Sequence, residues 1–218
     1  MRNLTEQMLL AQKGGVVTDG LLLWIDGSDA PDGFKVKNRV TDAYSVQPFM
    51  TQTPNNLQMS NTGNLLYVNG GAKEDYDFWW KDNNVNGSNA QTLEVSVGQV
   101  EYSVALFTQL TDVYFARLYI DNNQVGYGYG NRDKITISHE NIHHVIARPG
   151  KITINGTNYT TNVGFSDVMF DRILKYRRWR KDAMSFEIGA IRAYNRVLSD
   201  AEVLQNYQHE QRTRGFSV

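Results

Sequence analysis

The sequence contains no cysteine, and only four of its 218 residues are proline. No disulfide can stabilise the fold, but a chain of this length can bury a sufficient apolar core without one. No segment approaches the roughly 20 consecutive apolar residues of a membrane-spanning helix. The formal net charge is only −1, so no overall field favours nucleic acid or a membrane surface. We therefore expect neither as a partner.

Aromatic residues and glycine, in contrast, are frequent: the chain has 12 Tyr, 9 Phe, 4 Trp and 18 Gly. Aromatic side chains supply bulk for a core between two sheets, and glycine suits frequent turns. A length near 200 residues fits one all-β sandwich better than two small domains. We expect this domain at residues 19–218, after an N-terminal arm at residues 1–18.

Residues 3–13 favour a short helix with Leu4 and Met8 on one side, which is marginal unless it packs on a partner surface. Two interpretations stay open: the arm packs on its own domain, or it docks into an assembly. The first seven residues lack the apolar run of a signal peptide, so we expect synthesis and folding in a cytoplasm.

Strand patterns dominate from residue 92 onward. In residues 93–97, apolar and polar residues alternate, as in a strand with one face in water. Further strands are expected at 100–108, 113–120, 125–129, 135–137, 142–148, 151–154 and 184–194. Their spacing of roughly ten residues predicts an antiparallel two-sheet sandwich. Earlier in the chain we expect a buried strand at 20–26, and long loops with one or two short strands at 27–63.

A short C-terminal helix is expected after the last strand. Ser199 and Glu202 have the spacing of a capping box, and Gly215 is a plausible helix end. One apolar stripe is expected on this helix, formed by three residues: Val203, Leu204 and Tyr207.

Three segments resemble the laminin-G-like, concanavalin A-like jelly rolls. Residues 186–203 combine an Ile-rich strand, the step Tyr194-Asn195-Arg196, a Leu-Ser step and an acidic helix start. Residues 143–156 pair a His-His-Val strand with a strand that ends in Asn-Gly, and residues 20–26 are similar to the family's first strand. The resemblance implies an all-β, antiparallel two-sheet jelly-roll sandwich; it covers residues 20–30 and 92–210 and matches residues 31–91 poorly.

Members of this family bind glycans, proteins or lipids, and some are structural parts of phage particles, so the fold does not settle the ligand. Combined with cytoplasmic synthesis, the resemblance suggests a bacteriophage virion protein from a tail, baseplate or head fibre. Its expected role is adsorption to host-surface glycan or decoration of the particle, as a homo-oligomer among other virion proteins. The alternatives are a carbohydrate-active enzyme and a cellular lectin or adhesion module.

Catalytic patterns are not found. Glycosidases on this fold place two or three carboxylates at alternate positions of one strand, and no such spacing occurs here. Asp75 and Asp77 alternate, but an acidic cluster at the start of a loop is the favoured interpretation. His143 and His144 would point to opposite faces of one strand, so they cannot bind one metal ion together. We expect no catalytic residue and no enzymatic activity.

The turn at residues 26–33 is rich in oxygen ligands, because Asp26, Asp29 and Asp32 follow one another closely. Carboxylates in a tight turn suit calcium, but a plain acidic turn is the favoured interpretation. No other cofactor is expected.

Aromatic residues beside polar loops suggest a glycan platform. The candidates are Trp79 and Trp80 near Asp77, and the pair Tyr127 and Tyr129. Aromatic faces stack on sugar rings while nearby polar groups fix the hydroxyls. Packing within the core or on a sheet is the competing interpretation.

Residues 172–181 hold the only strong block of basic charge in the chain. Four of its members are candidates for contact with an anionic partner: Arg177, Arg178, Arg180 and Lys181. Contact with a neighbouring virion subunit, or a solvated loop, is favoured over binding to nucleic acid, which would need a larger basic surface.

Overall fold

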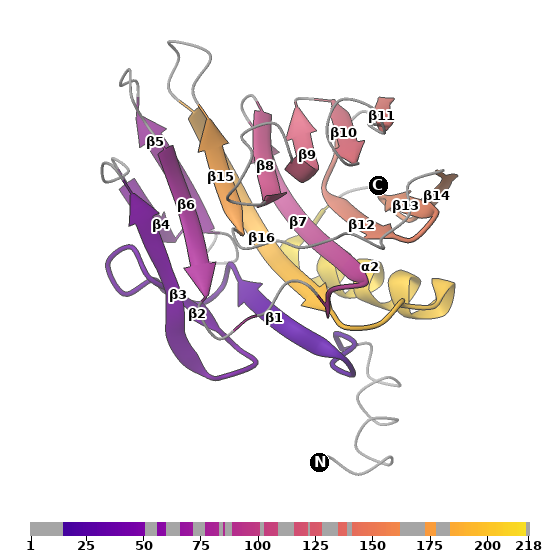
Figure 1. The fold of residues 1–218 in the computed structure, drawn as a ribbon, viewed down its shortest axis with the longest axis horizontal. Helices are drawn as coiled ribbons and strands as arrows, with labels where there is room; N and C mark the ends of the chain where they lie inside the picture. Colours follow the sequence, from indigo (N-terminus) through magenta and orange to yellow (C-terminus); the bar gives the residue numbers. More distant parts are fainter. Residues whose placement is uncertain are drawn as a thin grey trace.

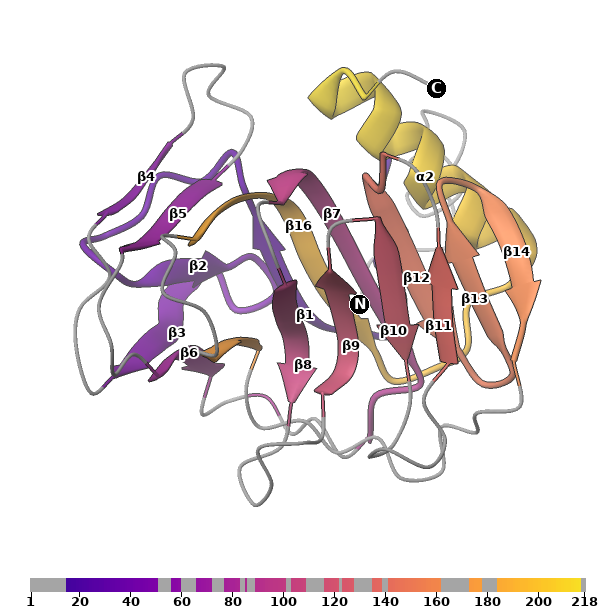
Figure 2. The same ribbon diagram turned by 90° about the horizontal axis from the view of Figure 1, so that it is seen from above.

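The computed structural model describes residues 15–50, 56–59, 66–71, 77–82, 85, 89–100, 103–108, 116–121, 123–127, 135–138, 141–161, 173–177 and 184–216. Within these residues, two antiparallel sheets lie face to face and one C-terminal helix covers the far side of one of them (Figures 1 and 2). The predicted antiparallel β-sandwich with a C-terminal helix is confirmed. The helix predicted at residues 3–13 lies outside the described residues.

The sheet that carries the helix is called the back sheet. Its strands follow the order β14-β13-β12-β7-β16-β5-β4, and β1 pairs with β16. The bounds of its strands are β1 Leu21–Asp26, β4 Asn56–Met59, β5 Leu66–Gly71, β7 Thr92–Val100, β12 His144–Arg148, β13 Lys151–Ile154, β14 Thr157–Thr160 and β16 Met184–Tyr194.

The second sheet, nearer the viewer in Figure 1, is called the front sheet. Its strands follow the order β11-β10-β9-β8-β15-β6-β3-β2. Their bounds are β2 Val36–Asn38, β3 Ala43–Met50, β6 Asp77–Asp82, β8 Ser103–Thr108, β9 Ala116–Asp121, β10 Gln124–Tyr127, β11 Ile135–Ser138 and β15 Leu174–Arg177.

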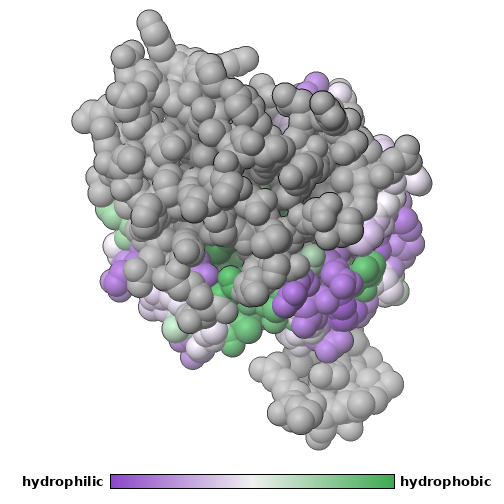
Figure 3. Space-filling model, viewed as in Figure 1, coloured by the Kyte–Doolittle hydropathy of each residue, from purple (hydrophilic) through white to green (hydrophobic). Residues whose placement is uncertain are grey.

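The apolar core lies between the two sheets. Alternate residues of each strand supply it, as the period of two requires. The fully buried members include Leu93, Val95 and Val97 from the back sheet, and Leu118 and Ile120 from the front sheet. Seen from the direction of Figure 1, the surface of the described residues mixes hydrophilic and hydrophobic residues (Figure 3). Among the described residues, no helix is both long and apolar enough to span a membrane.

One sequence prediction about loops is wrong. Residues 27–63 contain three strands, β2, β3 and β4, because polar Asn- and Gln-rich segments here pair with neighbouring strands. Within the basic block, residues 174–177 form β15, which lies between β6 and β8 in the front sheet. Residues 178–181 of the block lie outside the described residues, so its use in a subunit contact or a solvated loop stays a prediction.

The helix α2 (Asp200–Arg214) begins with the predicted capping box. Ser199 Oγ accepts from the amide of Glu202, whose carboxylate accepts in return from the amide of Ser199 at 2.8 Å. Gly215 ends the helix in the left-handed region, with φ of 69°. The predicted apolar stripe is wrong in part, because Leu204 is 49% exposed. The fully covered positions of the helix are instead Val203, Asn206 and Glu210.

Candidate functional site

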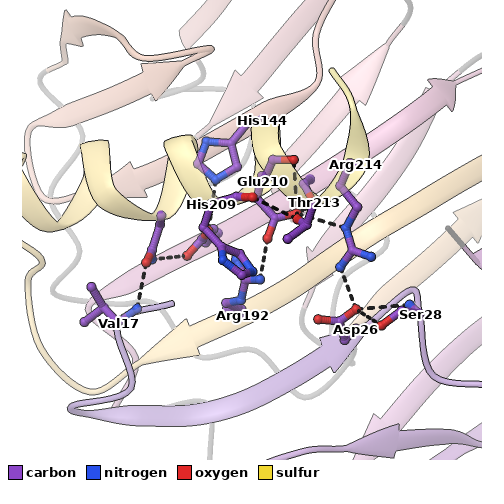
Figure 4. Close-up of polar contacts among 12 residues, drawn as sticks. Val17, Asp26, Ser28, His144, Arg192, His209, Glu210, Thr213 and Arg214 are labelled. Carbon is purple, nitrogen blue, oxygen red and sulfur yellow. Dashed lines mark hydrogen bonds and ion pairs between the residues drawn. The ribbon is translucent and has the colours of Figure 1, made fainter. Parts of the chain in front are cut away.

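Beneath α2, the guanidinium group of Arg192 points toward Glu210 of the helix (Figure 4), and two buried carboxylates share it. Arg192 of β16 donates from Nη1 to Glu94 Oε1 at 2.6 Å and from Nη2 to Glu210 Oε1 at 2.5 Å. None of these three side chains has exposed surface. Glu94 lies on β7 and Glu210 on α2, so the cluster fixes the helix to two central strands of the back sheet.

Neutral donors complete the coordination of both carboxylates. Glu94 Oε2 accepts from Tyr194 Oη at 3.1 Å and from Asn206 Nδ2 at 2.8 Å. Glu210 Oε2 accepts from Ser96 Oγ at 2.6 Å. The alternating pattern of β7 predicted a face in water, and this is wrong: that face is polar but lies under α2, which brings polar partners of its own.

The pKa values of both carboxyl groups are held below their ordinary values. Burial by itself raises the pKa of Glu210, but the charges of Arg192 and Arg214 and the hydrogen bond from Ser96 outweigh it. Burial also raises the pKa of Glu94, and here the charge of Arg192 is the main opposing cause. Both groups are therefore ionised at neutral pH and are locked in ion pairs.

The same ion pairs continue to the edge of the back sheet. Arg214 Nε lies 3.3 Å from Glu210 Oε2, and its Nη2 donates to Asp26 Oδ1 at 2.5 Å. Asp26 Oδ2 accepts from Arg39 Nη1 at 2.9 Å. Arg39 also binds both carboxylate oxygens of Asp29, at 2.7 and 2.9 Å. We call this connected set of acids and arginines the ionic network. Its members are Glu94, Arg192, Glu210, Arg214, Asp26, Arg39 and Asp29.

The arrangement disfavours the calcium site suggested by the sequence at Asp26, Asp29 and Asp32. Arg39 binds the first two carboxylates, so a guanidinium group occupies oxygens that a cation would need. Asp32 forms a backbone bridge with Lys35. In the described ranges, no group of three or more His, Asp or Glu residues is arranged to hold a metal ion.

The two neighbouring histidines, His143 directly before β12 and His144 at its first residue, have different partners. His144 is buried, and its Nε2 lies 2.9 Å from Glu94 Oε1. The ring of His143 stacks on Phe216, with centroids 4.9 Å apart. Every carboxylate of the ionic network contacts an arginine, and its centre is closed to solvent. The network is therefore suited to holding α2 in place and not to acid–base catalysis on a substrate.

The outer face of the front sheet is organised differently. Tyr119 of β9 and Gly126 of β10 are cross-strand partners. Their strand neighbours Leu118, Ile120 and Val125 are fully buried in the core, so Tyr119 and Gly126 belong to the face away from the core. A Cβ atom on Gly126 would overlap the Tyr119 ring. The glycine therefore allows the ring to lie across the neighbouring strand.

The register continues this face across the sheet. Tyr119 pairs with Ala105 of β8, Ala105 with Lys175 of β15, and Lys175 with Trp79 of β6. Directly opposed residues of antiparallel strands share a face. We call this line of positions the outer row: Gly126, Tyr119, Ala105, Lys175 and Trp79. Three strand spacings separate Tyr119 from Trp79, or about 14 Å.

A second route through the register gives the same assignment. Val46 of β3 is fully buried in the core and pairs with Asp82 of β6. Trp80 lies two residues before Asp82 and shares its face, so the position of Trp80 belongs to the core side. The adjacent position, Trp79, belongs to the outer face. The register followed from β10 and the register followed from β3 thus agree on which positions of β6 face the core.

The register separates the predicted glycan candidates. Asp77 and Trp79 are alternate positions of β6 and belong to the outer face. Trp80 belongs to the core side, and so does Tyr127, because it pairs with the buried Leu118. For these two positions the arrangement favours the competing interpretation, which was packing. Glycan binding by Asp77 and Trp79 stays a prediction.

The candidates for an anionic partner are described only at one position. Arg177 lies at the end of β15, directly opposite Asp77. The remaining candidates of both groups lie outside the described residues: Tyr129, Arg178, Arg180 and Lys181.

Sequence reasoning missed two positions of the outer row, Tyr119 and Lys175, as site residues. The alternation of Lys175 and Arg177 in one strand is a signal that both share a face. Their pairing with β6 and β8 is not visible in the sequence, because almost a hundred residues separate β6 from β15.

Comparison with known proteins gives the fold. No protein-family model matches this sequence, and no curated protein matches it either. A Trypanosoma rangeli sialidase structure is similar with a TM-score of 0.61 and 18% identity, over 91% of this chain and 34% of that chain. The binding domain of botulinum neurotoxin DC in complex with SialylT is similar with a TM-score of 0.58 and 11% identity, over 87% and 51%. This chain thus spans about half of the toxin binding domain and about a third of the sialidase.

Proposed function

We propose that this chain is a non-catalytic recognition module that binds glycan on the outer face of the front sheet. The observation that carries the proposal is the outer row. It places an aromatic position at Trp79 and another at Tyr119, with the small residues Ala105 and Gly126 at two of the other positions. Aromatic rings are the groups on which sugar rings stack, and small residues beside them leave room for a bound sugar.

The similar structures support this proposal through their architecture. One is a toxin binding domain in complex with a sialylated compound by its name, and another is a sialidase. The sandwich therefore accompanies glycan-directed proteins, although it does not determine what this chain binds.

We further propose that the module acts in a phage particle, where it contacts other virion proteins as a homo-oligomer and mediates adsorption to the host surface. Detection of the chain in purified particles by mass spectrometry is the expected result. Consistent absence from particles would overturn this part of the proposal and favour a cellular lectin.

Glycan binding can be tested with two variants of the outer row. Trp79→Ala removes an aromatic ring, and Gly126→Ala displaces the Tyr119 ring without removing it. Each should weaken binding to a responsive member of a bacterial polysaccharide panel by about tenfold, the loss expected for roughly 1.4 kcal/mol. The matched control is Leu204→Ala, which removes an exposed apolar side chain from α2 on the other side of the molecule. Equal weakening by the control would contradict the assignment of the face.

The same panel tests the proposed lack of catalysis. We expect no release of reducing ends from any polysaccharide. If the chain hydrolyses a polysaccharide, variants of the ionic network and of the outer face would locate the activity. Loss of hydrolysis only in an outer-face variant would show that the front sheet carries an active site.

A further inference from the structure

We infer that the outer face of the front sheet selects acidic glycans, those whose sugars carry a carboxylate or another anionic group. This inference rests on the proposed function and specifies its ligand. It derives from the central position of Lys175 in the outer row and from the charges at the neighbouring register positions.

Lys175 lies on β15, which has β6 on one side and β8 on the other. Its two directly opposed residues are Trp79 and Ala105, and both are uncharged. No acid thus stands opposite Lys175 in either neighbouring strand. Cross-strand partners are the nearest residues on a sheet face, at about 5 Å, so the register leaves this cation without an acidic cross-strand partner.

Arg177, two residues further along β15, provides the contrast. It shares the outer face with Lys175, but its cross-strand partner on β6 is Asp77. Opposite charges directly across two strands stabilise the pair. The register therefore pairs Arg177 with an acid of the protein, whereas Lys175 stands between an aromatic and a small residue.

Neighbouring positions on the outer face fit the same ligand. Lys81 belongs to the face of Trp79, two residues along β6, and pairs with the uncharged Gln47. Asp121 belongs to the face of Tyr119 on β9, and its partners there are Ser103 and Gln124. The basic positions thus gather on β6 and β15, and the second acid lies two strands away from β15.

These placements define a complementary ligand. A sugar ring bound at the Trp79 position would bring an attached anionic group to the neighbouring Lys175 position, one strand away. Because a charge-assisted hydrogen bond is stronger than a neutral one, we expect the anionic group to raise the affinity by a factor of roughly ten. A neutral glycan would use the aromatic positions alone and bind more weakly.

The test compares one glycan in two forms, a polyuronate and the same polymer after its carboxylates have been reduced to alcohols. Binding of the full chain is measured by calorimetry at low and at physiological salt. We expect the polyuronate to bind at least about tenfold more tightly, and this preference to shrink with salt. A sulfated polymer forms a third arm, and its binding would also support an acidic ligand.

Lys175→Gln should lower the affinity for the polyuronate to about that for the reduced polymer, and so abolish the preference. The matched control is Lys35→Gln, which removes the same charge from an exposed residue outside the front sheet. Equal losses in both variants would reduce the effect to net charge and overturn the inference. A thermal melt verifies folding, and Lys175→Arg should retain the preference if glutamine is not tolerated.

Failure of the inference differs from failure of the proposed function. Equal affinity of the wild-type chain for both forms of the polymer would overturn acidic selection while glycan binding stands. No binding to either form, to the sulfated polymer or to any neutral glycan would overturn both.

Discussion

The outer faces of the two sheets carry polar and charged residues in strands that alternate in the same way, but they use them differently. On the back sheet, Glu94 and Arg192 lie under α2 with no exposed surface and bind to each other. On the front sheet, no described helix covers the outer face, and the register leaves Lys175 without an acid across from it. Charge in a strand is therefore a sign of binding only where the protein itself has not paired and covered it.

The largest effect should come from removing the shared cation of the back sheet. Arg192→Met leaves Glu94 and Glu210 as buried carboxylates without their common partner, so we expect a loss of about 3–5 kcal/mol in the free energy of unfolding. Urea denaturation measures it. Lys175→Met on the front sheet is the counterpart and should change stability by less than about 0.5 kcal/mol. Similar losses in both variants would remove the distinction between the two faces.

The second effect is a dependence of stability on pH that belongs to the back sheet. The folded-state pKa values of Glu94 and Glu210 lie below the unfolded value of about 4.3. Their contribution to the free energy of unfolding is therefore fully present above the unfolded pKa. It is lost as the pH falls below the unfolded pKa toward the folded pKa. We expect the melting temperature to decline steeply below about pH 4.5.

In Glu210→Gln this decline should be shallower, because one of the depressed carboxyl groups no longer takes up a proton. Asp32→Asn, which replaces an exposed carboxylate in the turn after β1, is the control and should keep the wild-type slope. If Glu210→Gln and the wild-type chain show parallel pH profiles, the ionic network does not govern acid stability.

These two faces also show how far the sequence can be interpreted. The capping box at Ser199 and Glu202 is local, so the start of α2 could be predicted from four residues. The alternation in β7 correctly separates Leu93 from Glu94, but it cannot distinguish water from a polar helix on the second face. That distinction depends on α2, more than a hundred residues later, which turns Asn206 and Glu210 toward the sheet.

The front sheet shows the same limit from the other side. Trp79 and Trp80 are neighbours in the sequence and equal as candidates for stacking. Only the pairing of β6 with β3 and β15 assigns one to the outer face and the other to the core side. Long-range register is the information that the sequence pattern alone does not contain.

A third comparison uses one glycine from each sheet. A Cβ atom on Gly189 of β16 would overlap Ser96 Oγ and approach Arg214 Nε to 3.4 Å, within the buried network. We expect Gly189→Ala to cost about 1–3 kcal/mol, as overpacking does in a close-packed interior. In Gly126→Ala the obstructing atoms are the outer atoms of the partly exposed Tyr119 ring, at the end of a side chain outside the core, so the loss should stay below about 1 kcal/mol. Thermal denaturation of both variants measures the two losses. A larger loss in Gly126→Ala than in Gly189→Ala would contradict this prediction.

A smaller effect is expected at the start of α2. Ser199→Ala removes the hydroxyl that accepts from the amide of Glu202 and should cost about 1 kcal/mol. The loss should appear as faster hydrogen exchange in the first turn of α2, while the amides of β9 and β10 in the front sheet keep their protection. Ser199→Thr preserves the acceptor and should restore most of the protection.

The smallest expected effect concerns the corner where the ionic network reaches the surface. If Asp26 and Asp29 are occupied by Arg39, as their distances of 2.7–2.9 Å indicate, a chelator such as EDTA should leave the melting temperature unchanged, and added calcium should not raise it. Arg39→Gln would free these oxygens, so a calcium response confined to this variant would show that the arginine takes the place of the metal. A bound calcium ion and the guanidinium group of Arg39 would compete for the same oxygens. A calcium-dependent rise in the melting temperature of the wild-type chain would therefore show that this corner is a metal site and not part of the ionic network.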